Sequence, residues 1–287
     1  MMLPPTAAEY KGRSLALLVG QDAMKMLDSE SQATHRSCEF LFKNDRVLTV
    51  SNIKRFGDVE ITQGDDFVAA VEVQRGPNNF FDHQLIADLA EAMEWLDKSE
   101  ACRAAVLCSQ GKNFCAGANF HTPGAGLESR ERHLYDEAVR LFSTKTPLVA
   151  AVQGAAVGGG LGLALWADFR VGCRESRFCA NFARLGFHHG FGLTLTLPAA
   201  IGNQRALEML YTGCRLKGAE ALAIGLCDEL VDLSDVRTAA HARALEIARS
   251  APLAIESIRT TMRGDLPQLI RAATDREKYE QERLMET

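Results

Sequence analysis

The pattern of hydrophobic and polar positions divides the chain of 287 residues into three parts. Residues 1–55 show no sustained period, and one short helix near residues 16–26 is the most that they predict. From residue 56 onward short β-rich runs alternate with helical periods, and beyond residue 202 helical periods dominate. We therefore expect an irregular N-terminal extension (1–55), a mixed core (56–202) and a helical C-terminal region (203–287).

The core region repeats the order strand, helix, strand. Its first two β-rich runs are separated by Gly64-Asp65-Asp66, which is typical of a hairpin. Repeated units of this kind favour an α/β core with right-handed crossovers. The predicted strands span residues 59–62, 67–73, 104–108, 147–153, 169–171 and 177–179, and the predicted helices span residues 85–96, surround residues 134–141 and start at residue 158.

The C-terminal region has helical periods almost throughout, starting after Asn203, a residue type that often caps a helix. One strand is expected near Leu230. The predicted helices span residues 204–211, 218–224, 236–249, 252–263 and 267–284. Their apolar residues, which include Leu253, Ile258 and Ile270, exceed what a lone core can cover, so we expect self-association.

Composition narrows the range of partners. Hydrophobic residues make up 47% of the chain, enough for a large core, and the formal net charge is -5. This charge provides no broad positive field for nucleic acid or an anionic membrane. No apolar run approaches the roughly 20 residues that cross a bilayer, and no signal segment is visible, so we expect a cytoplasmic protein. The 8 cysteines form no C-x-x-C pair, which favours reduced thiols over a metal site.

Candidate chemistry lies in two segments of small residues that follow predicted strands. Residues 111–120 come after the strand at 104–108, and residues 153–160 leave the strand at 147–152 and open a helix. Small residues let a ligand approach backbone N–H groups, and a helix N-terminus adds unpaired N–H groups and a partial positive charge. Two such turns can donate two hydrogen bonds to one carbonyl oxygen.

Several short motifs resemble signatures of the crotonase (enoyl-CoA hydratase/isomerase) superfamily, in the expected order. They lie at residues 75–79, 114–118, 154–160, 167–169 and 185–186, and the resemblance covers roughly residues 59–273. It implies a spiral of ββα units and a helical C-terminal part that joins subunits into trimers, often paired into hexamers. It also implies an acyl thioester substrate, with Ala118 and Gly159 as the two amide donors and Ala116 and Gly158 beside them.

Two positions depart from the hydratase pattern. Gly162 and Phe182 occupy the places where the resemblance implies catalytic glutamates. Hydration needs one carboxylate to activate water and another to donate a proton, and neither of these residues can do so. The sequence is closer to the decarboxylase-type branch of polyketide β-branching pathways, which lacks both glutamates. The lysine of that branch has no match in residues 121–126.

Histidines offer the missing acid–base chemistry. His189 occupies a turn position where methylmalonyl-CoA decarboxylases have a tyrosine and dihydroxynaphthoyl-CoA synthases an aspartate. An ordinary histidine pKa of about 6.5 suits proton transfer near neutrality. We therefore expect His189 to be catalytic, and we expect His121, His188, Gly162 and Phe182 to bind substrate; a purely structural histidine is the alternative.

The favoured interpretation is a thioester lyase that acts through a stabilised enolate, with decarboxylation as the leading reaction. A hydratase or isomerase that uses His189 and a bound water is one alternative, and a catalytically silent thioester-binding subunit is another. The acyl carrier is either coenzyme A or an acyl carrier protein. Beyond coenzyme A as part of the substrate we expect no cofactor and no metal, and we expect a homotrimer or hexamer.

Overall fold

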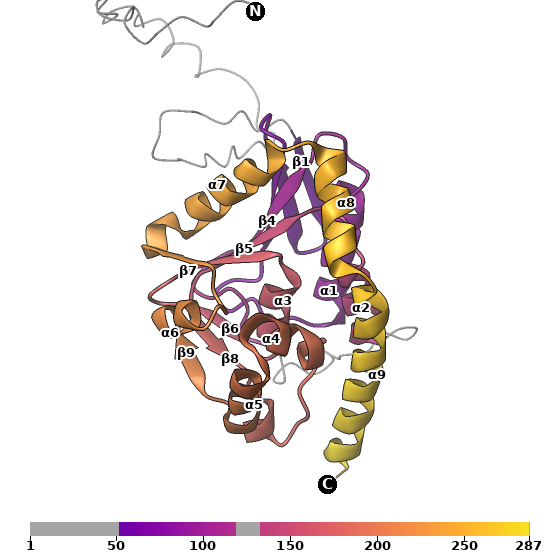
Figure 1. The fold of residues 1–287 in the computed structure, drawn as a ribbon, viewed down its shortest axis with the longest axis vertical. Helices are drawn as coiled ribbons and strands as arrows, with labels where there is room; N and C mark the ends of the chain where they lie inside the picture. Colours follow the sequence, from indigo (N-terminus) through magenta and orange to yellow (C-terminus); the bar gives the residue numbers. More distant parts are fainter. Residues whose placement is uncertain (1–51, 119–132, 287) are drawn as a thin grey trace, which may run out of the picture. The chain divides into compact units, whose positions relative to one another are not determined.

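The computed structural model describes residues 52–118 and 133–286, which all belong to a compact unit of residues 42–287 (Figure 1). The helix expected near residues 16–26 lies outside the described residues. The described strands are β1 (Asn52–Phe56), β2 (Val59–Gln63), β3 (Val68–Val73), β4 (Ala104–Ser109), β5 (Leu148–Val152), β6 (Ala155–Val157), β7 (Phe169–Cys173), β8 (Arg177–Cys179), β9 (Arg215–Lys217) and β10 (Glu229–Val231).

The strands form two sheets. The larger is seven-stranded in the order β1-β2-β3-β4-β5-β7-β10, and the smaller has the order β6-β8-β9. The predicted hairpin is confirmed, because β2 and β3 pair antiparallel with Val59 opposite Val73. From β3 to β10 the large sheet is parallel, and β4 and β5 are buried along their whole length, as expected for strands covered on both faces.

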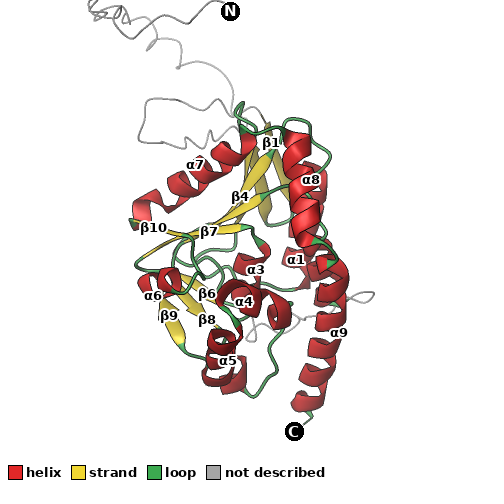
Figure 2. Cartoon of the chain, viewed as in Figure 1, coloured by secondary structure: helices red, strands yellow, loops and turns green. Residues whose placement is uncertain are grey.

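Helices cover both faces of the large sheet (Figure 2). The described helices are α1 (His83–Leu96), α2 (Leu134–Phe142), α3 (Gly159–Trp166), η1 (Phe182–Leu185), α4 (Leu193–Ile201), α5 (Asn203–Thr212), α6 (Gly218–Ala223), η2 (Leu233–Asp235), α7 (Val236–Ala248), α8 (Pro252–Arg263) and α9 (Leu266–Met285). Buried residues of α1, α2 and α3 share one apolar cluster, and α7 packs on the other face through Ala240, Ala244 and Ala248. This layered arrangement confirms the α/β core.

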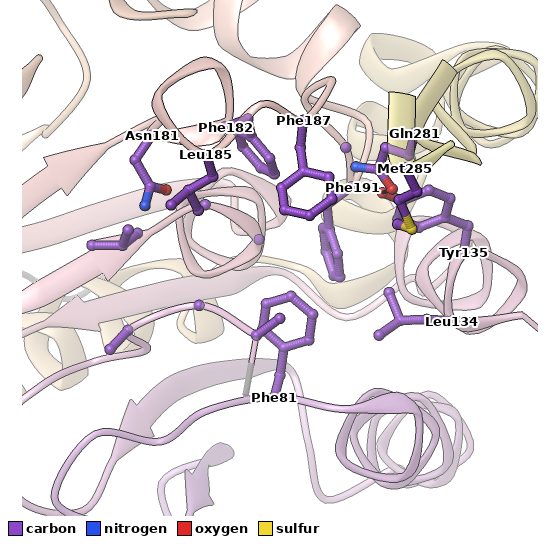
Figure 3. Close-up of a pocket in the computed structure, with 17 residues that line it drawn as sticks. Phe81, Leu134, Tyr135, Asn181, Phe182, Leu185, Phe187, Phe191, Gln281 and Met285 are labelled. Atoms are coloured by element: carbon purple, nitrogen blue, oxygen red, sulfur yellow. Dashed lines mark hydrogen bonds between the residues drawn. The ribbon is translucent and has the colours of Figure 1, made fainter. Parts of the chain in front are cut away.

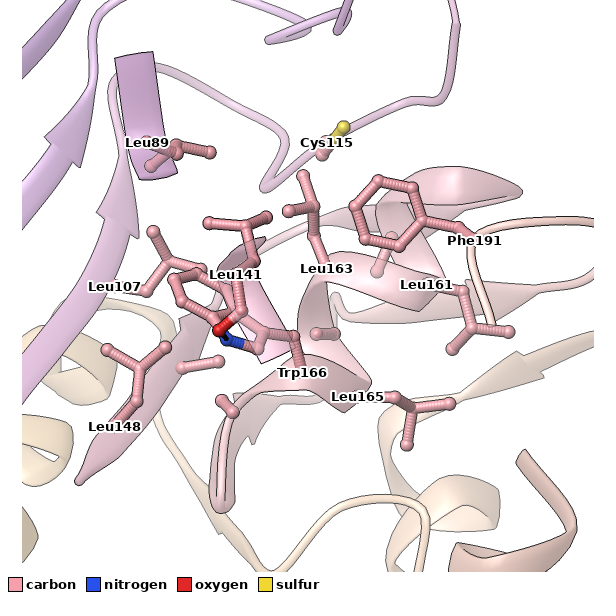
Figure 4. Packing of buried hydrophobic residues seen from close by; sticks show 14 of the residues in the cluster. Leu89, Leu107, Cys115, Leu141, Leu148, Leu161, Leu163, Leu165, Trp166 and Phe191 are labelled. Atoms are coloured by element: carbon pink, nitrogen blue, oxygen red, sulfur yellow. Dashed lines mark hydrogen bonds between the residues drawn. The ribbon is translucent and has the colours of Figure 1, made fainter. Parts of the chain in front are cut away.

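The larger cluster fixes α3 in place (Figure 4). Trp166, the last residue of α3, is buried, and its Nε1 donates to the carbonyl oxygen of Leu141 at 2.7 Å. Leu107 of β4 and Leu148 of β5 belong to the same cluster. All eight residues of α3 are buried, so this helix is a rigid support for the turn that precedes it.

The C-terminal helices attach in different ways. None of the residues of α8 is buried, and Arg259 and Arg263 hold this helix through hydrogen bonds to the carboxylate of Asp168. Leu253 and Met262 of α8 are 80% and 81% exposed, which leaves the expected self-association open as a prediction. Helix α9 instead contacts α2 and α4 and buries several side chains. Of the described helices, none has the length and apolar character that a membrane span requires.

Some elements were not expected from the sequence. They are β1, β6, β9, η1, η2 and α4. Strands β6 and β9 have three residues each, too few to show a period, and α4 follows a glycine-rich stretch that looks like a loop. The N-cap of α5 is Gly202, and Asn203 is the first helical residue. Strands β9 and β10 also place the region after residue 202 in both sheets.

Candidate active site

A cavity of about 270 Å³ opens beside the N-terminus of α3 (Figure 3). Its wall combines two stretches of small residues with aromatic and aliphatic side chains. The lining residues are Phe81, Ala116, Gly117, Ala118, Leu134, Tyr135, Val157, Gly158, Gly159, Asn181, Phe182, Leu185, Phe187, Gly190, Phe191, Gln281 and Met285. Among the described residues, this lining includes no carboxylate and no imidazole, so the cavity is apolar with a few neutral polar groups.

The two small-residue segments lie side by side in register. Cys115 and Ala156 form a parallel bridge, in which the N–H of Cys115 donates to Ala155 at 2.9 Å and the N–H of Val157 donates to Cys115 at 3.0 Å. Ala118 follows Cys115 by as many positions as Gly159 follows Ala156. Both residues line the cavity, so the sequence-predicted donor pair is brought to one place.

The N–H groups of this pair are oriented by the local backbone. Ala118 bridges Phe81 in a parallel arrangement, in which the N–H of Phe81 donates to the carbonyl oxygen of Gly117, the residue before Ala118. The N–H of Ala118 itself takes no part in this bond. The first helical bonds of α3 run from Leu161 and Gly162 to Gly158, so the N–H of Gly159 has no acceptor within the helix.

Close packing requires glycine at the start of α3. A Cβ atom on Gly159 would lie 2.2 Å from Cζ of Phe81, and one on Gly160 would lie 2.2 Å from the carbonyl oxygen of Cys115. Gly158 has a φ of 58° and a ψ of -121°, a backbone conformation that only glycine adopts readily. The glycines therefore let the two backbone segments and Phe81 approach the same point.

The structure describes eight of the nine predicted site residues and separates them into two groups. Ala116, Ala118, Gly158, Gly159 and Phe182 all line the cavity. His121 lies outside the described residues. Gly162, His188 and His189 are not among the residues that line the cavity.

Gly162 lies behind the cavity wall. A Cβ atom there would lie 2.6 Å from the ring of Phe191, which packs against Phe81 with ring centroids 5.9 Å apart. The space in which a glutamate at position 162 would extend is therefore filled by an aromatic ring. Phe182 occupies the second expected carboxylate position and supplies apolar surface to the cavity.

His189 is bonded to a side chain of the same turn. Its Nε2 lies 2.9 Å from Oγ1 of Thr194, and this hydroxyl donates its own hydrogen to Glu277 at 2.6 Å. Nε2 of His189 must therefore carry a hydrogen and donate it to Oγ1 of Thr194. Its ring stacks on that of His188 at 4.1 Å. Burial first, and then the charge of His188, lower the pKa of His189 to about 4. The surroundings of His189 thus place its pKa below the ordinary histidine value, and the catalytic role stays a prediction.

Three polar residues of the wall, Asn181, Tyr135 and Gln281, were not anticipated, and the last two are bonded to each other. The hydroxyl of Tyr135 donates to Oε1 of Gln281 at 2.9 Å, and Nε2 of Gln281 donates to the carbonyl oxygen of His188 at 2.8 Å. Tyr135 lies in the amphipathic helix α2, at a position where the sequence pattern predicts an ordinary core residue. Gln281 lies in the highly charged helix α9, where the sequence pattern predicts that a glutamine is exposed to solvent. Neither sequence pattern identifies a site.

Helix α9 fixes the turn that closes the cavity. Glu277 is fully buried and accepts hydrogen bonds from the N–H groups of Gly192 and Thr194 as well as from the Thr194 hydroxyl. Desolvation raises the pKa of Glu277, and these hydrogen bonds oppose the rise. One helical turn further on, Gln281 holds His188. Residues 188–194 are thus held at both ends by α9.

Comparisons with known proteins agree on one family. The family model described as enoyl-CoA hydratase/isomerase matches residues 63–286. The probable enoyl-CoA hydratase EchA14 of Mycobacterium tuberculosis is 36% identical over 185 residues, which cover 63% of this chain and 72% of that protein.

Solved structures agree with the fold. The enoyl-CoA hydratase/isomerase of Pseudoalteromonas atlantica is 24% identical with a TM-score of 0.74, covering 80% of this chain and 92% of its own. A structure from Geobacillus kaustophilus, titled as an enoyl-CoA hydratase subunit I, is 30% identical with a TM-score of 0.66, covering 80% and 88%. At 24% identity, the structure from Pseudoalteromonas atlantica supports the fold alone.

Proposed function

Because the chain belongs to the enoyl-CoA hydratase/isomerase family, we propose that it binds an acyl thioester whose carbonyl oxygen accepts hydrogen bonds from Ala118 and Gly159. The carrier is coenzyme A or an acyl carrier protein. Two preorganised N–H donors in a cavity with little polar surface stabilise negative charge on that oxygen more strongly than water does. The supported intermediate is an enolate of the thioester.

The reaction that we propose is decarboxylation of a malonyl- or glutaconyl-type thioester. The bond between the α-carbon (or its vinylogous position) and the carboxylate breaks, CO2 leaves, and the electron pair moves into the enolate. A proton then adds to the carbon. The observation that carries this proposal is the pairing of the two amides with a lining that, among the described residues, lacks any carboxylate. A carboxylate substrate in this apolar surrounding is destabilised relative to its uncharged product.

The source of the proton is the second part of the proposal. His189 is the candidate from the sequence, and its bond to Thr194 orients the ring. With a pKa of about 4, the imidazole is neutral near pH 7 and donates only if substrate binding raises that pKa. Water is the other source, because an enolate needs no strong acid to be protonated on carbon.

A hydratase or isomerase is the second candidate, since relatives in Mycobacterium tuberculosis and Bacillus subtilis are described as probable enoyl-CoA hydratases. In this reading, His189 and a bound water replace the missing glutamates. The two candidates differ in their products: the hydratase adds water to a 2-enoyl thioester and releases no CO2. A silent thioester-binding subunit is the third, and it predicts binding without turnover.

A screen of thioesters separates these candidates. The protein is incubated with malonyl-type and 2-enoyl-CoA panels, and mass spectrometry follows the loss of CO2, the gain of water, and deuterium exchange at the α-carbon. We expect loss of CO2 from at least one malonyl-type member. Hydration of an enoyl member without loss of CO2 contradicts the decarboxylase and supports the hydratase. Retention of a thioester without any product supports the silent subunit.

A further inference from the structure

The cavity has different chemistry at its two ends. Asn181 marks one end, because a Cβ atom on Gly158 would lie 3.5 Å from the Asn181 side-chain oxygen. Tyr135 and Gln281 lie at the other end, next to Leu134 and Met285, and phenylalanine rings lie between (Figure 3). An acyl chain that starts at Gly159 therefore passes apolar walls before it reaches Tyr135 and Gln281.

At this far end, the hydrogen bonds between the described residues use only one of the two N–H donors of Gln281. The carbonyl oxygen of His188 can only accept, so the atom of Gln281 that faces it is the amide nitrogen. The amide oxygen accepts from Tyr135. The amide nitrogen carries two hydrogens and uses one of them for His188. Gln281 is 8% exposed and Tyr135 is 6% exposed, so this remaining donor lies in a water-poor part of the wall.

Charge selects among the groups that this donor can bind. Burial first, and then the nearby charge of Glu277, raise the pKa of the Tyr135 phenol above its usual value. A second carboxylate at this end would meet the same unfavourable field, with no described cation in the lining to offset it. The far end therefore favours a neutral acceptor such as a hydroxyl or carbonyl oxygen.

We propose that Gln281, positioned by Tyr135 and the His188 carbonyl, recognises a neutral oxygen at the far end of the acyl group. Of the two proposed substrate types this selects the malonyl type, whose leaving carboxylate lies on the α-carbon, with an acyl chain that has an apolar middle and a neutral oxygen at its terminus. This inference rests on the proposed function, because it takes the thioester carbonyl to lie at Ala118 and Gly159. An acyl chain without the oxygen leaves the buried donor unpaired, which penalises its binding.

The test compares matched ligands in a binding assay that needs no turnover. A chain-length series of saturated S-(2-oxoalkyl)-CoA thioethers, which keep a carbonyl oxygen for Ala118 and Gly159 but cannot be hydrolysed, is titrated by calorimetry beside the terminal-hydroxyl counterparts. At one chain length, we expect the hydroxyl compound to bind about 10-fold more tightly than its plain counterpart, the range for one buried hydrogen bond. The plain compound binding equally well or better at every length would overturn the assignment of Gln281.

Variants separate recognition from structure. Gln281→Leu keeps the bulk of the side chain without its amide, and we expect the preference for the hydroxyl compound to fall to about 1-fold. Met285→Leu, a change at the same end that involves no hydrogen bond, should keep the preference. Persistence of the preference in a folded Gln281→Leu protein would also overturn the assignment. If none of the thioethers binds, either as a coenzyme A derivative or loaded on an acyl carrier protein, the thioester function fails, and the recognition by Gln281 fails with it.

Discussion

Removing the N–H of Gly159 should lower kcat by a large factor, and the structure shows how to remove it without a steric clash. Proline lacks this hydrogen, but any Cβ atom at position 159 would strike Cζ and Cε1 of Phe81, at 2.2 and 2.4 Å. Leucine at position 81 has no atoms in those places. We therefore place the substitutions in a Phe81→Leu background and compare Gly159→Ala, which keeps the N–H, with Gly159→Pro, which does not.

The backbone at this point accepts proline. Position 159 is the first residue of α3, where proline is well tolerated because its missing N–H has no helical acceptor. The ψ of -121° at Gly158 also keeps that residue out of the helical conformation that a following proline disfavours. The two variants should therefore unfold at similar temperatures, which thermal denaturation checks.

The expected difference is in the chemical step. Losing one preorganised donor to an oxyanion typically raises the barrier by ~3 kcal/mol, so kcat of the proline variant should be about 10² to 10³ lower than that of the alanine variant. Product formation on the substrate identified by mass spectrometry measures this ratio. Equal kcat values in two folded variants would refute the role of Gly159.

Three further predictions address other parts of the protein. If the imidazole of His189 transfers the proton, His189→Gln should lower kcat by ~10² or more with little change in KM. His188→Gln should lower kcat far less. If both variants keep the native kcat, both histidines are structural. Because the pKa of Glu277 is raised, the folded state holds its proton more tightly than the unfolded state, so the stability that it contributes falls as the pH rises from about 4.5. Chemical denaturation should show this decline relative to Glu277→Gln, and parallel curves would contradict it. Met262→Asp, on the exposed face of α8, should shift sedimentation from a trimer or hexamer toward about 31.4 kDa, whereas a monomeric native protein would contradict self-association.

The sequence predicted most of the core because apolar runs and glycine turns are local signals. Strands β4 and β5 and the start of α3 were expected close to their observed bounds. The donor pair was expected from small residues and from the family resemblance, and the in-register bridge between Cys115 and Ala156 brings the pair to one cavity. Its catalytic role remains a prediction.

The rest depends on contacts between distant segments. Tyr135 meets Gln281 across 146 positions, and no local pattern predicts that meeting. No local pattern predicts the surroundings of His189 either, and burial and the charge of His188 lower its pKa to about 4. A sequence reveals which groups can titrate, but it does not reveal how much water reaches them.

The attachment of α9 makes the cavity depend on a peripheral helix. Its buried side chains include those of Glu277 and Gln281, and these two hold the turn at residues 188–194. Helices attached by one face often detach by local unfolding well before the whole protein unfolds. Each detachment would release the turn and abolish the far wall. The share of molecules able to bind therefore follows the local equilibrium of α9, and a bound thioester should slow amide hydrogen exchange along this helix.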